Sequence, residues 1–180
     1  SSEGERWGND IERMKESGTT LVGDSLLAGA FVSYIGAFNA EYREALWKDL
    51  WLKDLIERQI PLTEGVDPLD VITDDSRTAQ MQSEGLPADR MSCENGSMIT
   101  QTSRWPLLID PQLQGIKWLR QKETMAAERK AAQMKAEAEA AGEDPNLIVV
   151  NSNLMLLQLS NNNWVKRLTA GIANGNTVII

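Results

Sequence analysis

Apolar residues recur at helical spacing through the N-terminal third of the chain. Over residues 3–16 they fall three and four positions apart, so they share one stripe of a helix that is otherwise charged. The stripe consists of Trp7, Ile11 and Met14, and we interpret Trp7 as a packing residue. Ser17 and Gly18 are expected to end this helix, because glycine is common just past a helix end. We therefore predict a separate lead-in helix over residues 1–18.

Two more helices are predicted next. One fits residues 20–35, and the other begins at an Asn39 cap and runs to Pro61. Trp47 and Trp51 share a face of the later helix, and we interpret them as packing residues, because tryptophan mainly buries area against its neighbours.

The middle of the chain is punctuated by caps and turns. Asp67 followed by Pro68 predicts the start of a short helix, since proline suits the first helical position. The run Gly-Leu-Pro at 85–87 predicts a break, and residues 97–102 are expected to form a short strand.

The second half of the chain favours an α/β layout. The continuous apolar run 105–109 predicts a strand that is covered on both faces, followed by a helix. That helix is expected to bury Leu113, Ile116 and Leu119. Residues 123–141 are rich in alanine, glutamate and lysine with few large apolar side chains, so we expect an exposed helical extension rather than a partner-binding helix. Gly142 and Pro145 should end it.

The last residues favour further strands around one helix. Residues 147–150 predict a strand, and residues 154–159 either prolong it or form a second one. Asparagines at 161–163 are expected to cap a helix whose inward residues are Trp164, Val165, Leu168 and Ile172. A turn then leads into a buried strand at 177–180. Because this strand has no exit, we expect an excised fragment.

Composition excludes several functions. Of 180 residues, 42% are apolar, enough for one core. Acidic residues outnumber basic ones eight to two between positions 62 and 94, which argues against a nucleic-acid surface. The chain has no histidine, which excludes most serine, cysteine and zinc hydrolase designs, and its single cysteine, Cys93, suits a reducing compartment.

The most apolar stretch, residues 21–38, is expected to be a buried helix rather than a membrane span. It carries Asp24 and three glycines, and it lacks the uninterrupted apolar length that a span needs. No secretory signal pattern precedes it. We expect a cytoplasmic protein without a membrane partner.

The strand, turn and helix expected over residues 104–119 have the layout in which nucleotide-binding proteins place the phosphate loop G-x-x-x-x-G-K-[ST]. If Gly115 takes the second glycine, Asp110 takes the first, Ile116 replaces the lysine and Lys117 replaces the hydroxyl. Sliding the frame by one restores only the lysine, and the Asp110 carboxylate would repel a phosphate. We interpret the segment as a degenerate phosphate loop without catalytic or metal-binding residues. Its positions are Asp110, Pro111, Gln112, Leu113, Gln114, Gly115, Ile116 and Lys117.

Two alternatives stay open at this point. The amides and helix dipole at positions 111–116 could hold a nucleotide without a lysine, although Asp110 opposes this. Asp74 and Asp75 could instead bind a divalent cation in an acidic interaction domain, but they lack the alternating spacing and central glycine of a calcium loop. A helix cap or a solvated face suits them better.

Several motifs in order resemble the dynein heavy chain. They are LVGDSLLA at 21–28, SYIGAF at 33–38, GLPAD at 85–89, SCENG at 92–96 and WPLLIDPQ at 105–112. The resemblance covers nearly the whole chain and is to the region where the returning helix of the microtubule-binding stalk ends and the fifth AAA+ module of the motor ring begins. Residues 61–63 and 89–92 lean toward axonemal forms.

The resemblance implies that residues 1–18 end the stalk's returning, coiled-coil helix. Residues 19–180 would be the N-terminal part of a degenerate, P-loop NTPase-like AAA+ large subdomain, with residues 123–145 as an insertion. The resemblance also implies that the chain is truncated before the last strands and lid of this subdomain, so it would have open strand edges, which invite association between copies. Such a module does not hydrolyse ATP and relays force; ATP and Mg²⁺ would bind other modules of the parent chain, and no cofactor is expected here. The implied partners are neighbouring AAA+ modules, microtubules reached through the stalk, and intermediate and light chains, in the axoneme of a cilium or flagellum.

Overall fold

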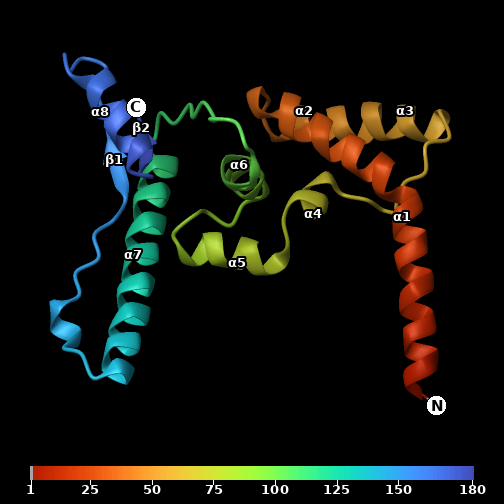
Figure 1. The fold of residues 1–180 in the computed structure, drawn as a ribbon. Helices are drawn as coiled ribbons and strands as arrows, with labels where there is room; N and C mark the ends of the chain where they lie inside the picture. Colours follow the sequence, from red (N-terminus) through yellow and green to blue (C-terminus); the bar gives the residue numbers. More distant parts are fainter. Residues whose placement is uncertain (1) are drawn as a thin grey trace. The chain divides into compact units, whose positions relative to one another are not determined.

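A computed structural model describes residues 2–180. The chain folds into two compact units. The first unit holds the residues up to Gln82 together with Pro87–Leu107, and the second holds Ser83–Leu86 and Leu108–Ile180. Figure 1 labels the helices and strands of both units.

The first unit begins with one long helix, α1, Ser2–Tyr34. Its N-terminal half projects past the connection between α3 and α4, as Figure 1 shows. The expected helix end at Ser17 and Gly18 is therefore wrong: once a helix is nucleated, each added residue gains a hydrogen bond, and the helix-forming sequence on both sides outweighs the cost of one glycine, about 1 kcal/mol. The domain boundary predicted at residue 18 stays a prediction.

The stripe expected to pack on this first stretch lies in solvent. Trp7 is 72% exposed and Met14 is 73% exposed, so the interpretation of Trp7 as a packing residue is wrong within the part of the chain that the structure describes.

The predicted Asn39 cap is confirmed. After η1, Ile35–Ala37, the Asn39 side chain accepts a hydrogen bond from the amide of Tyr42 at 3.0 Å and starts α2, Ala40–Glu44. The helix continues as a π-helical stretch, η2, Ala45–Trp51, and then as α3, Leu52–Glu57. It ends before Pro61, because Gln59 turns the chain with a φ of +57°.

Three further helices complete this unit. They are α4, Pro68–Ile72, α5, Asp75–Ser83, and α6, Arg90–Gln101. The predicted Asp67 cap on α4 is confirmed, since its carboxylate accepts from the amide of Leu69 at 2.9 Å. The strand expected at 97–102 is wrong: Asp89 caps α6 through the amide of Ser92, and the helix that starts there buries Ser97 completely.

The core of the first unit forms where α1 meets the π-helical stretch. Phe31 and Ile35 are fully buried against Trp47, which is 8% exposed. Partly buried side chains surround them: Trp51, Leu52, Ile72 and Met98. The interpretation of Trp47 and Trp51 as packing residues is confirmed, and the π-helical widening lies where these tryptophans meet α1.

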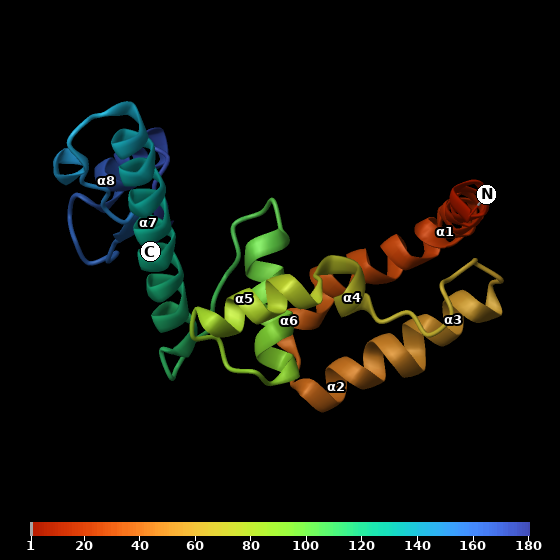
Figure 2. The ribbon, with the colours of Figure 1, turned by 90° about the horizontal axis from the view of Figure 1, so that it is seen from below.

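The second unit is built on the long helix α7, Gln114–Ala141, seen end to end in Figure 2. Gly142 ends α7 in the left-handed conformation with a φ of +77°, as predicted. The short 3-10 helix η3, Pro145–Leu147, follows, and then β1, Leu154–Leu156, α8, Trp164–Ala173, and β2, Thr177–Ile179. β1 and β2 pair in parallel, with Leu154 opposite Thr177, so α8 is the crossover of a βαβ unit. The expected α/β fold, mostly helical with a short parallel sheet, is confirmed.

Three segments that were predicted to be strands are not strands, or are strands only in part. Residues 105–109 form no ladder within residues 2–180, and their outward side chains are among the most exposed in the chain: Trp105 at 89%, Leu107 at 89% and Ile109 at 85%. Residues 147–150 form no strand: Leu147 is the last residue of η3, and residues 148–150 have no regular secondary structure. Of the stretch 154–159, only the first three residues pair.

Burial around the small sheet is also lower than expected. A sheet of two short strands covers little of α8, so Val165 and Ile172 remain 55% and 50% exposed although both were expected to face inward. At the start of α7, Trp118 is buried, whereas Leu113 is 63% exposed. The expectation that Leu113 belongs to the core is wrong.

The segment Gly18–Ala37 has the length and apolar composition to cross a membrane, with a mean hydropathy of 1.3. Its side chains lie in two environments. About a quarter of its most apolar stretch is buried (28%), including Phe31 and Ile35 in the core described above. The expected buried helix is therefore observed along one face.

Candidate functional site

The segment predicted to be a degenerate phosphate loop forms a turn that leads into the second unit's long helix. The amide of Leu113 donates to the carbonyl of Asp110 at 3.1 Å, which closes the turn. Leu113 then adopts a left-handed conformation with φ of +58°, and α7 begins at Gln114. The predicted turn and helix are present, whereas the strand that should precede them is not.

The Asp110 carboxylate caps the N-terminus of α7. Its Oδ1 accepts from the amide of Gln114 at 3.0 Å, and its Oδ2 accepts from the amide of Ile116 at 2.9 Å. These amides are among those that have no partner within the helix, and they lie at the positive end of the helix dipole. One carboxylate therefore supplies both the hydrogen bonds and the negative charge that this helix end requires.

Gly115 allows this close approach. A Cβ at this position would lie 3.3 Å from Oδ2 of Asp110 and 3.2 Å from a methyl group of Leu108, tighter than ordinary contacts. In a working phosphate loop the glycines let the backbone approach a phosphate. Here the glycine brings the backbone close to a carboxylate of the same chain.

The other positions of the degenerate loop lie at the surface. Pro111, Gln112 and Gln114 are exposed, and so is Lys117, whose amide donates to the carbonyl of Leu113 at 3.2 Å. Ile116 is half-buried. The structure thus brings Asp110, Gly115 and Ile116 together and leaves the only lysine of the loop in solvent.

Sequence reasoning treated Asp110 as a repulsive charge and missed its capping role. The signal was present, because Asp110 and Pro111 repeat the pair that predicted the cap at Asp67 and Pro68. Asp67 is the residue directly before α4, whereas Asp110 lies four residues before α7 and reaches its amides across the turn.

The acidic pair Asp74 and Asp75 also takes part in a helix start. Asp74 accepts from the amide of Arg77 at 2.8 Å and pairs with its guanidinium at 3.7 Å. Among the side chains that the structure describes, no group of three or more aspartate, glutamate or cysteine residues is placed to hold a metal ion. The interpretation of Asp74 as a helix cap is confirmed.

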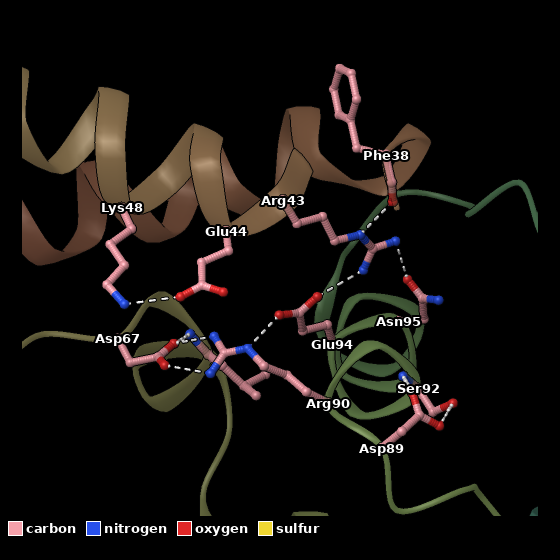
Figure 3. A network of polar contacts seen from close by, with 11 residues as sticks. Phe38, Arg43, Glu44, Lys48, Asp67, Asp89, Arg90, Ser92, Glu94 and Asn95 are labelled. Carbon is pink, nitrogen blue, oxygen red and sulfur yellow. Dashed lines mark hydrogen bonds and ion pairs between the residues drawn. The ribbon is translucent and has the colours of Figure 1, made fainter. Parts of the chain in front are cut away.

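A buried ionic network in the first unit was not foreseen (Figure 3). Arg43 of α2 donates to Glu94 of α6 at 2.9 Å, to the Asn95 side chain at 2.8 Å and to the carbonyl of Phe38 at 2.8 Å. A fourth, longer bond of 3.3 Å reaches the carbonyl of Gly36. The partners lie up to 52 residues apart, so no local pattern could have predicted the network.

Arg90 extends this network to α4. Its Nη1 and Nη2 donate to the two oxygens of Asp67 at 2.7 and 2.9 Å, and its Nε donates to Glu94 at 2.8 Å. The guanidinium also lies 5.7 Å from the ring centre of Trp47, a cation–π distance. Bonding to Asp67 raises the pKa of Arg90, against the effect of burial. Burial alone would raise the pKa of Asp67, but the bonds from Arg90 and from the amide of Leu69 outweigh it and lower that pKa.

Comparison with known proteins matches both units of the chain. Residues 79–180 match the family model described as the ATP-binding dynein motor region, and residues 1–55 match the microtubule-binding stalk of the dynein motor. Residues 79–180 thus belong to a motor region of the AAA+ class.

The similar relatives are dynein heavy chains. The chain is 54% identical over 124 residues to the beta chain of the flagellar outer arm of Chlamydomonas reinhardtii, which covers 69% of this chain and 3% of that protein. It is 51% identical to the ciliary beta chain of Tripneustes gratilla and 46% identical to axonemal heavy chain 17 of Homo sapiens, each over 68% of this chain and 3% of the relative. The chain belongs to the dynein heavy-chain family, which confirms the resemblance and its axonemal leaning. It spans about 3% of the length of these relatives.

Proposed function

We propose that this chain is a non-hydrolysing AAA+ segment of an ATP-driven microtubule motor, and that it acts as a structural and force-relay element between the hydrolysing ring and the stalk. The observation that carries the proposal is the Asp110 carboxylate on the amides of Gln114 and Ile116. A nucleotide phosphate would have to displace an anion that is covalently part of the chain and already bonded. If the phosphate bound while Asp110 stayed nearby, the negative charges of the phosphate and of the carboxylate would repel each other.

The position of the two family matches supports the relay role. The stalk match and the motor-region match lie on one chain and are separated only by residues 56–78, and α1 to α3 cover the stalk match. The implied partners are neighbouring AAA+ modules and, through the stalk, microtubules, with intermediate and light chains in the parent complex. The names of the relatives support a place in the axoneme of a cilium or flagellum.

Calorimetric titration of ATP and ADP with Mg²⁺ into the chain tests the proposal. We expect no binding at millimolar nucleotide. A triple variant, Asp110→Gly, Ile116→Lys and Lys117→Thr, rebuilds the G-x-x-x-x-G-K-T pattern on Gly115 and is the comparator. Micromolar binding by the unmodified chain would overturn the proposal.

A second candidate is a regulatory nucleotide-binding module with an atypical phosphate loop. The description of the matching motor region as ATP-binding favours it. On this view Asp110 would leave the end of α7 when nucleotide arrives. Micromolar binding that strengthens in the Asp110→Asn variant would support this candidate, because that substitution removes only the competing charge.

A further inference from the structure

The helix α1 changes its surroundings near its midpoint. The side chains described between residues 4 and 19 are exposed, and Gly23 is the first buried position of α1 among the residues whose burial is described. From there the inward positions Leu27 and Phe31 are at most 1% exposed. The projecting half of the helix therefore joins the packed half at Gly23.

The segment between α3 and α4 crosses α1 at this junction. A Cβ on Gly23 would lie 2.9 Å from a methyl group of Leu62 and 3.1 Å from one of Ile60, and it would overlap the carbonyl oxygen of Pro61. The nearest obstacle is a backbone atom, which cannot rotate away as a side chain can. Only glycine fits at this point of the helix.

The residue after Gly23 holds the same segment by hydrogen bonds. Asp24 accepts from the amide of Thr63 at 2.9 Å and from its hydroxyl at 2.6 Å. One turn earlier, the hydroxyl of Thr20 lies 2.9 Å from that of Thr63. Thr63 is thus held from two successive turns of α1, on either side of the glycine.

This arrangement permits a single register of α1. A slip by one helical turn, about four residues, would bring Thr19 or Leu27 to the position of Gly23. Either side chain would collide with the carbonyl of Pro61 and would separate Asp24 from Thr63. We propose that Gly23 and the Asp24–Thr63 pair form a register lock, so that an axial push or pull on the projecting half of α1 moves the first unit instead of sliding the helix.

The lock goes beyond the function proposed for the Asp110 turn, since it requires neither nucleotide binding nor its absence. It concerns the helix that lies within the stalk match at residues 1–55. Failure of one proposal would leave the other standing, because the residues and the measurements differ.

A matched pair of glycine substitutions tests the lock. Gly23 and Gly29 lie on the same helix, but a Cβ on Gly29 meets nothing within 4 Å. Spin labels are attached at Met14→Cys and Ile56→Cys, two positions of the first unit whose side chains are 73% and 60% exposed. The distance between the labels, measured by pulsed electron paramagnetic resonance, reports the position of α1. Cys93 is buried, and the chain without the introduced thiols is the blank. We expect Gly23→Ala to shift or broaden the distance distribution and Gly29→Ala to leave it unchanged.

A second pair of variants keeps the test decisive if Gly23→Ala does not fold. Thr63→Ser retains the hydroxyl that Asp24 accepts from, whereas Thr63→Val removes it with little change in shape. We expect the amides around Gly23 to exchange with solvent about tenfold faster in Thr63→Val than in Thr63→Ser, as the loss of one bond to a charged group predicts. Exchange at the amides of Phe31 and Ile35 reports whether the core at Trp47 remains intact. Equal exchange in the two threonine variants, or equal distance distributions in the two glycine variants, would refute the lock.

Discussion

Arg43 and Glu94 form an ion pair of 2.9 Å whose side chains are only 3% and 4% exposed. A buried pair contributes little beyond a well-packed apolar pair, but removal of one partner leaves a charge without compensation. Because Arg43 also bonds the Asn95 side chain and the carbonyl of Phe38, it joins α2, α6 and the turn before α2. The pair therefore holds together segments that the sequence separates widely.

We expect Arg43→Met to lower the free energy of unfolding by about 3–5 kcal/mol, the usual range for breaking a buried pair. The bond from Arg90 to Glu94 favours the lower end, because it still compensates part of the charge. The control is Lys53→Met, which breaks a pair with Asp49 that is 63% and 64% exposed and should change stability by at most about 1 kcal/mol. Urea unfolding measures both variants, and equal effects would contradict the importance of the buried pair.

The bidentate contact between Arg90 and Asp67 makes the stability of the chain depend on pH. The pKa of Asp67 is lowered in the folded chain, so the unfolded chain binds protons more readily. The contribution of Asp67 is fully present above its unfolded pKa of about 3.9, and it is lost as pH falls through the lower, folded pKa. Stability should therefore decline below about pH 4.

The variant Asp67→Asn isolates the charge, since asparagine still caps a helix well. We expect it to be less stable than the unmodified chain at neutral pH and to show a shallower decline in acid. Asp89, whose pKa is lowered chiefly by the Ser92 hydroxyl, should still cause part of the decline of stability in acid in this variant. Urea midpoints measured across pH 2–7 give both curves; parallel curves would show that Asp67 does not carry the dependence.

Local signals predicted local structure well. The caps at Asn39 and Asp67 and the helix end at Gly142 each depend on residues within a few positions of one another, and all three are confirmed. The packing of Trp47 also followed from helical spacing.

Failures of prediction fall where distant residues decide and also where one local signal outweighs another. The run 105–109 has strand-like residues, but a strand exists only where another segment pairs with it, and none does within residues 2–180. At 97–102 the cap at Asp89 and the burial of Ser97 favoured helix over β propensity. In the degenerate loop, motif comparison identified what was missing, whereas only the folded turn revealed what the Asp110 carboxylate binds.

The cap on α7 should contribute measurable stability. We expect Asp110→Ala to destabilise the second unit by about 1 kcal/mol, as for other lost N-caps, and Asp110→Asn to cost less. Hydrogen exchange at the first turn of α7 and thermal unfolding measure the effect. The control is Asp144→Ala, which removes a comparable bond to the amide of Asn146 at the three-residue helix η3 and should leave the first turn of α7 unchanged. Unchanged exchange in Asp110→Ala would show that the carboxylate does not hold this helix end.

The two-stranded sheet leads to a last prediction, association between copies of the chain. β1 and β2 pair only with each other within residues 2–180, so each strand has an unpaired edge, and unpaired edges favour pairing with a second chain. We expect sedimentation velocity to show species that grow with protein concentration. Leu156→Lys places a charge on β1 and should reduce association, whereas Val165→Lys places the same charge on α8, where the side chain is 55% exposed, and should not. A reversed order would assign association to the apolar face of α8, and a monomer at every concentration would contradict the role of the edges.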